Sequence, residues 1–244
     1  MSEIKLVVIR HGRFFIPALM LLLVISIIKM CIDTLLVQQI YSISLILIFS
    51  GMSVYALDYL ITLVGVNKDY LMLSSPMSRF ITAQINCSVL TLYLALGGAI
   101  VALTSKSTNL VQVDLAVFVQ YIFSVLSSLY LMLCIVVLLK KIRSSMAYRI
   151  GAWMCFIIVI CILAALVISN ISLISSSENW LIGSTTLSSG SVIYTSALPI
   201  VLFDPINPVH LTITFALYNA ALFAGCFCLS CVLMRRPCDY VSLS

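Results

Sequence analysis

Residues 67–79 read Asn-Lys-Asp-Tyr-Leu-Met-Leu-Ser-Ser-Pro-Met-Ser-Arg and separate two long apolar runs of the chain. The charges of Lys68-Asp69 and Arg79 exclude this stretch from the core of a bilayer. The block Tyr70-Leu71-Met72-Leu73 is nevertheless too apolar for a plain solvated loop. A short helix at the membrane surface fits both facts, and Pro76 would end it. Its apolar side chains would then rest either on lipid headgroups or on another protein.

The composition of the whole chain is that of a membrane protein. Of its 244 residues, 63% are hydrophobic and 9% are charged, whereas soluble domains carry about 25% charged residues. The apolar runs are continuous rather than alternating, which argues against a β-barrel. No polar stretch is long enough to bury a core of its own. We therefore expect an all-α membrane protein with one transmembrane domain over residues 1–244.

Six apolar runs have about 19 residues or more, the length that a helix needs to cross a bilayer. Residues 1–16 overlap the first run and predict an amphipathic surface helix. Its apolar stripe lies beside the basic Lys5, Arg10 and Arg13 and consists of Ile4, Val7, Val8, Phe14 and Phe15. The predicted spans are Phe14–Ile32, Ile40–Val66, Phe80–Leu103, Leu115–Leu139, Ile150–Ile171 and Val209–Met234.

Basic residues predict the orientation of these spans, because Lys and Arg accumulate on the cytoplasmic side. Eleven of the thirteen Lys and Arg residues fall at one set of helix ends, and only Lys29 and Lys106 fall at the other. Both termini and residues 67–79 are therefore predicted to be cytoplasmic. The chain would be a multi-pass protein of the cytoplasmic membrane.

Residues 172–208 form the longest connection between spans and are too long for a tight turn. They contain the apolar run Val192–Phe203, which is too short to span a bilayer and ends at Asp204-Pro205. This run predicts a re-entrant or interfacial helix on the outer side. A seventh span is the alternative, and it would place Arg235 and Arg236 outside, against the charge bias.

Asp58 is the acidic residue that lies deepest within a predicted span. It shares one helix face with Gly51, Tyr55 and Thr62, which lie seven, three and four residues away from it. An acid within a membrane usually faces a cavity or a partner. Tyr55, Asp58 and Thr62 therefore either line a translocation path, or Asp58 is a structural acid near the inner interface.

Other polar positions favour helix packing over chemistry. Stripes that include Gln84, Ser88 and Gly98 on the third span, and Ser124, Ser127 and Ser128 on the fourth, are typical of packed helices. The cysteines in the apolar runs act as small hydrophobes, and we predict no metal site. No phosphate-binding loop of the form Gly-x-x-x-x-Gly-Lys-Ser/Thr occurs in the sequence. We predict no catalytic residues and no cofactor for the chain itself.

This layout resembles the type-2 ABC transporter permeases, the membrane subunits of many exporters. That family has six spans, cytoplasmic termini, an amphipathic first helix, a coupling helix between spans two and three, and re-entrant helices between spans five and six. Residues 1–16, 67–79 and 172–208 are similar to those three features, and Leu73–Arg79 is similar to the Ser-Pro stretch after the coupling helix.

The resemblance implies a permease subunit of an ABC exporter that works with a separate ATPase, which would bind ATP and Mg²⁺. The partners would be two ATPase copies, a second permease, either the same chain or a different one, and the bilayer, but no nucleic acid. The cargo would be apolar or amphipathic, such as a peptide toxin or bacteriocin. The residues implied in ATPase docking are Asp69, Tyr70, Leu71, Met72, Leu73, Pro76 and Arg79. A secondary transporter for a small hydrophobic solute and an intramembrane enzyme are the alternatives.

Overall fold

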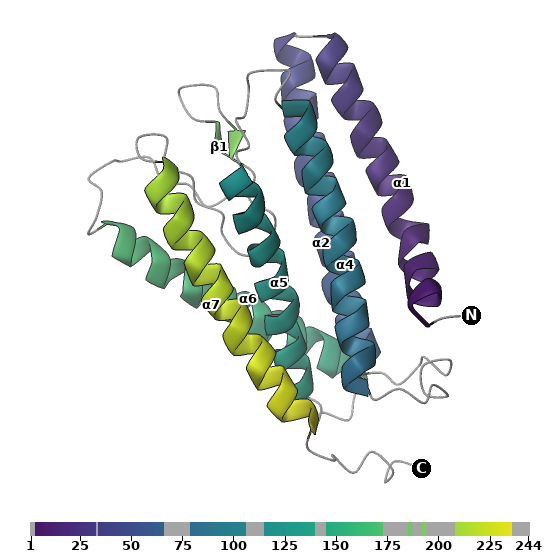
Figure 1. Cartoon of the computed structure of the whole chain (residues 1–244), viewed down its shortest axis with the longest axis vertical. Helices are drawn as coiled ribbons and strands as arrows, with labels where there is room; N and C mark the ends of the chain where they lie inside the picture. The colour runs from purple at the N-terminus through teal and green to yellow at the C-terminus, as the bar shows by residue number, and fades with distance from the viewer. Residues whose placement is uncertain are drawn as a thin grey trace.

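A computed structural model describes residues 3–32, 34–65, 79–105, 115–139, 145–172, 185–186, 192–193 and 208–235. Six of its helices are long and apolar enough to cross a membrane, which confirms the predicted all-α fold and the six spans (Figure 1). Helices are favoured because a helix satisfies its own backbone hydrogen bonds in lipid. The helices are α1 (Glu3–Cys31), α2 (Leu35–Gly65), α4 (Arg79–Ser105), α5 (Leu115–Leu138), α6 (Ser145–Ser172) and α7 (Pro208–Arg235).

The residues at the starts of α2 and α7 explain why these helices begin there. The hydroxyl of Thr34 accepts a hydrogen bond from the backbone N–H of Val37 at 3.4 Å and so caps the start of α2. The helix α7 begins at Pro208, where a missing N–H costs nothing because the first turn has no partner for it. Pro17 lies inside α1, which continues through it to Cys31.

The helix α5 is the centre of the bundle, since it packs against α2, α4, α6 and α7, while α1 packs against α2 and α4. Five helices run roughly along the bundle, and α6 runs obliquely to them (Figure 1). We call the end that holds the start of α1 the basal end; it is the lower end in Figure 1. The last residues of α2 and the first residues of α4 lie at this end.

The structure corrects the predicted surface helix over residues 1–16. From Glu3 onward these residues are the first turns of α1 and continue into the span without a break. The face made by Val7, His11 and Phe15 is fully buried in the bundle, whereas Ile4 and Phe14 of the predicted stripe are exposed. The sequence pattern misled because a buried histidine occupies the centre of the packed face.

The predicted re-entrant helix also begins differently. Val192 and Ile193 form strand β2, which pairs antiparallel with β1 (Thr185–Thr186), so the run Val192–Phe203 does not start as a helix. All four paired residues are β-branched, a type of side chain that favours strands. The remainder of that run, and residues 67–78 of the predicted coupling segment, lie outside the described residues.

Small residues bring α4 and α5 together, as the stripes predicted in part. Ser124, Ser127 and Ser128 are buried. A Cβ added at Gly98 would lie 2.8 Å from the Tyr121 ring. Ser88, however, is exposed, because α4 buries instead the face that carries Cys87, Leu90 and Leu94.

Candidate functional site

A buried histidine joins α1 to α4 near the basal end. The Nε2 atom of His11 donates to Oδ1 of Asn86 at 3.0 Å, and both side chains are 0% exposed. Asn86 in turn donates through Nδ2 to the carbonyl of Thr82 at 2.8 Å, one turn earlier in α4. That second bond orients the amide, so its oxygen faces His11 and the imidazole proton sits on Nε2.

Aromatic rings surround this histidine. Tyr59 meets the imidazole edge-on with 4.4 Å between ring centroids, and Tyr55 does so at 6.1 Å. Phe14 stacks on Tyr55 at 4.2 Å and Phe15 stacks on Tyr93 at 5.0 Å. These rings seal α1 against α2 and α4, and each pair adds about 0.5–1.5 kcal/mol beyond the area that it buries.

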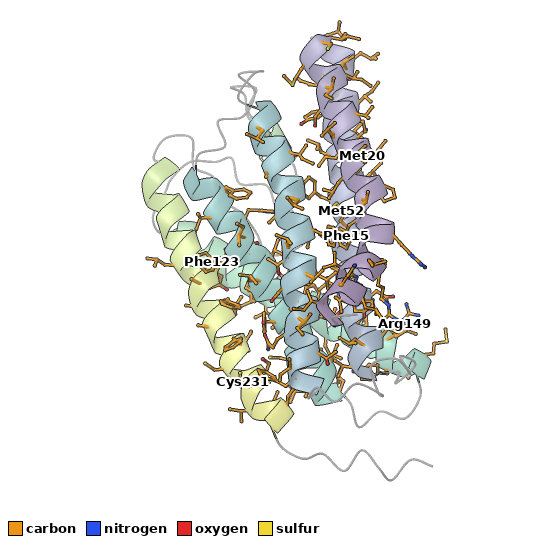
Figure 2. The ribbon with its side chains drawn as sticks, turned by 45° about the vertical axis from the view of Figure 1, so that its right-hand side comes forward. Phe15, Met20, Met52, Phe123, Arg149 and Cys231 are labelled. Atoms are coloured by element: carbon orange, nitrogen blue, oxygen red, sulfur yellow. The ribbon has the colours of Figure 1, made fainter. Side chains whose placement is uncertain are left out.

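Charged groups lie at the edge of the same aromatic layer. Arg10 donates from Nη1 to the hydroxyl of Tyr59 at 3.1 Å. Arg149 of α6 donates from one nitrogen, Nη2, to both carboxylate oxygens of Asp58, at 2.6 and 2.7 Å. The Arg149 side chain is 51% exposed and that of Asp58 is 31% exposed. Figure 2 labels Arg149 at the basal part of the molecule.

We call these residues the basal cluster, and they come from four helices: Arg10, His11, Tyr55, Asp58, Tyr59, Asn86 and Arg149. Of the three residues predicted for a translocation path, Tyr55 and Asp58 belong to it. Thr62 instead donates to the backbone carbonyl of Asp58 at 2.9 Å, one turn earlier in the same helix. Whether any of the three touches a cargo stays a prediction.

The predicted docking residues Asp69, Tyr70, Leu71, Met72, Leu73 and Pro76 lie outside the described residues. Arg79 is the first residue of α4, and its side chain is likewise outside them. What the structure describes are the two helix ends that flank this segment. Asp58 and Asn86 each lie seven residues, about two turns, from those ends at Gly65 and Arg79.

A second polar region lies between α5 and α7, and we call it the α5–α7 interface. Cys134 donates from Sγ to the carbonyl of Cys226 at 3.2 Å. Tyr130 hydrogen-bonds Gln84 of α4 through its hydroxyl, and its ring packs edge-on against Phe223 and Phe227 of α7. These contacts hold the two helices side by side.

Asn219 is the anomaly of that interface. Its side chain is 1% exposed, yet neither amide atom has a hydrogen-bond partner among the described residues. The Tyr130–Phe223 contact sets the level of the two parallel helices, and Asn219 lies one turn before Phe223. It therefore lies at the level of Ser127, whose hydroxyl bonds the backbone of its own helix.

Sequence reasoning missed His11, Asn86 and Arg149 as members of one site. A lone acid inside a span requires a partner, and Arg149 is a basic residue at the same end of the bundle, so that pair had a usable signal. The spacing of Val7, His11 and Phe15 by four residues places them on one helix face. Nothing in the sequence indicated Asn86 as the partner of His11.

Comparison of the chain with protein-family models, with curated proteins and with solved structures gives no match. Within the ranges that the structure describes, no three His, Cys, Asp or Glu side chains gather as metal ligands would. The layout of the helices and the contacts of the basal cluster are therefore the features from which a function can be inferred.

Proposed function

We propose that this chain is the membrane subunit of an ATP-driven ABC exporter that moves an apolar or amphipathic cargo, peptide or lipid-like, across the cytoplasmic membrane. A separate ATPase would bind ATP and Mg²⁺, and two copies of each subunit would form the transporter. Six helices long enough to cross a bilayer support a permease. The concentration of Lys and Arg at one set of helix ends supports cytoplasmic termini.

The observation that carries the proposal is the position of the basal cluster close to the two helix ends, Gly65 and Arg79, that flank residues 66–78. That segment joins α2 to α4, and both helices enter the cluster about two turns from their ends. A displacement of the segment would reach α1 through the His11–Asn86 bond and α6 through the Arg149–Asp58 pair. An ATPase that moved this one segment would therefore move α1, α2 and α4 together, with α6 attached to them only by a partly exposed ion pair.

The apolar block Tyr70–Leu73 would be the docking surface. A short amphipathic helix binds a partner by placing its apolar face in a groove, and aromatic or long aliphatic anchors contribute about 2 kcal/mol or more each. Loss of that much weakens binding about thirtyfold. If the block rests only on lipid headgroups, its truncation leaves the ATPase unaffected, since lipids replace the lost contact.

The test is the double variant Tyr70→Ala with Leu71→Ala. We expect the permease to insert normally but to lose the ATPase on co-purification, and to lose ATP turnover that responds to cargo. The matched control is Ile157→Ala with Ile158→Ala, two exposed apolar residues of α6, which should leave both measurements unchanged. Co-purification and turnover equal to those of the unmutated protein would remove the support for an ABC exporter.

A secondary transporter is the second candidate, and Asp58 is the observation that favours it, because ion-coupled carriers place acids within the membrane. The ion pair weakens this alternative, because the Asp58 carboxylate already binds the Arg149 guanidinium rather than standing open to a coupling ion. Transport in vesicles separates the two candidates. Export that needs ATP and survives a protonophore supports the ABC exporter, and the reverse supports the carrier.

A further inference from the structure

Two amides, one on α7 and one on α4, have buried atoms without hydrogen-bond partners in the described part of the chain. They are both amide atoms of Asn219 on α7 and Nε2 of Gln84 on α4. The other amide atom of Gln84, Oε1, accepts from the hydroxyl of Tyr130 on α5. An amide offers both a donor and an acceptor, so Asn219 can satisfy Gln84 whichever way the Gln84 amide is turned.

One turn of α7 separates the two amides. Tyr130, which holds Gln84, packs its ring against Phe223 and Phe227. Asn219 precedes Phe223 by four residues, so it continues the same stripe of α7 one turn farther from the basal end. A slide of α7 by one turn, about 5.4 Å, toward the basal end would bring Asn219 to the place of Phe223, beside the Gln84 amide.

The contacts between α5 and α7 can be remade after such a slide. Cys134 now donates to the carbonyl of Cys226. Backbone carbonyls repeat at every turn, so the carbonyl of Leu222 would take that place. The hydroxyls of Ser127 and Ser128 donate to the backbone of α5 itself, so these two bonds do not depend on the position of α7.

The length and the packing of α7 also allow the slide. The helix has 28 residues and is therefore about 42 Å long, whereas the hydrocarbon core of a bilayer is about 30 Å thick. A shift of one turn is smaller than this excess, so the helix still spans the core. Among the described helices, α7 packs mainly against α5 and only slightly against α4 (Figure 1).

We propose that α7 has two registers on α5. The present register is the one described above, and the shifted register lies one turn nearer the basal end, with the Asn219 amide hydrogen-bonded to Gln84. One-turn shifts of one packed element past another occur in allosteric proteins. The shifted register pairs two buried amides and replaces one ring contact of Tyr130. This inference does not depend on the proposed exporter, because it concerns two arrangements of one chain.

The test is disulfide formation at Cys134 in the full-length chain in lipid bilayers, with every other native cysteine replaced by alanine. Ser230→Cys reports the present register, because the Cys134 thiol also interacts with the backbone of Ser230. Leu222→Cys reports the shifted register. Ala224→Cys is the matched control, since Ala224 is exposed and points about 200° away from Leu222.

Diamide, a membrane-permeant oxidant, takes two electrons and two protons from a thiol pair and so forms the disulfide. Mass spectrometry measures the loss of both free thiols within one chain. Ser230→Cys should link fastest, and Leu222→Cys should link more slowly but clearly faster than Ala224→Cys. Linking of Leu222→Cys at the rate of Ala224→Cys would overturn the proposal.

The role of the amides is tested by adding Asn219→Leu or Gln84→Met to these variants. Each should slow the linking of Leu222→Cys about fivefold to tenfold, the effect of losing one buried hydrogen bond. Neither should slow the linking of Ser230→Cys. Linking of Leu222→Cys at an unchanged rate in both variants would overturn the proposal. If Asn219→Leu fails to fold, an unchanged rate in Gln84→Met overturns it alone.

Discussion

The basal cluster and the α5–α7 interface hold helices together by different means. In the basal cluster, side chains bond side chains from other helices, as in the His11–Asn86 and Arg149–Asp58 pairs. At the α5–α7 interface, a thiol bonds a backbone carbonyl, aromatic rings meet edge to face, and the buried amide of Asn219 has no hydrogen-bond partner within the described ranges. Bonds between side chains of different helices dominate the first region, whereas ring contacts and one thiol hydrogen bond dominate the contacts of α5 with α7.

The difference bears on which helices can move against each other. Side-chain hydrogen bonds between buried groups fix one register, because any slip leaves a donor or acceptor unpaired in a low dielectric. Contacts of sulfur and aromatic rings lose less when they shift, since each is weak and its loss leaves no strong donor or acceptor unpaired. We therefore expect α1, α2 and α4 to move as one body, and the α5–α7 interface to be where a conformational change is accommodated.

The largest effect should come from truncating the aromatic layer. Phe15 is fully buried and stacks on Tyr93, so Phe15→Ala should lower the free energy of unfolding by about 3–5 kcal/mol. Phe227 at the α5–α7 interface is 37% exposed, and Phe227→Ala should cost clearly less. Denaturation in detergent measures both. Equal losses would show that the two regions are equally rigid and would break the comparison.

A smaller effect is expected from the His11–Asn86 bond. The variant His11→Leu leaves the Asn86 oxygen buried without a donor, which should cost about 1–3 kcal/mol. Adding Asn86→Leu removes the orphaned group and should restore part of the loss. The measurement is a double-mutant cycle on unfolding free energy. Additive losses would mean that the bond contributes no coupling between α1 and α4.

Asn219 should give a change of opposite sign. Since neither amide atom has a partner among the described residues, Asn219→Leu removes a desolvation penalty and should stabilise the protein by about 1–2 kcal/mol. Thermal unfolding in detergent measures this. Destabilisation would indicate that the Asn219 amide is hydrogen-bonded in the protein. The α5–α7 interface would then be a second region in which buried polar hydrogen bonds hold helices together. Loss of transport with gained stability would place Asn219 in the functional cycle.

The smallest effect should follow Asp58→Asn. Its ion pair with Arg149 is partly exposed, and such pairs contribute about 0–1 kcal/mol. We expect slightly lower yield of assembled protein and unchanged transport per assembled complex. Arg149→Lys, which keeps the charge, should behave like the unmutated protein. A clean transport defect in Asp58→Asn at normal yield would assign Asp58 to the translocation path instead.

The sequence by itself determined the number of spans and their approximate bounds. The limits of α5 and α7 differ from the predicted spans by no more than one residue, because in lipid the backbone must be helical wherever an apolar run is long enough. The same rule did not reveal that the first residues of the chain belong to the first long helix. An amphipathic start looks like a surface helix, yet residues from Glu3 onward are part of α1.

Only the tertiary structure decided which polar groups meet. His11 and Asn86 are 75 residues apart and Arg149 and Asp58 are 91 apart, and helix periodicity relates residues within one helix, not across helices. Which faces pack depends on how α4 and α5 approach at Gly98 and on how α1 lies against both α2 and α4. Those are properties of the assembled bundle, because each buried polar group needs a partner that another helix supplies.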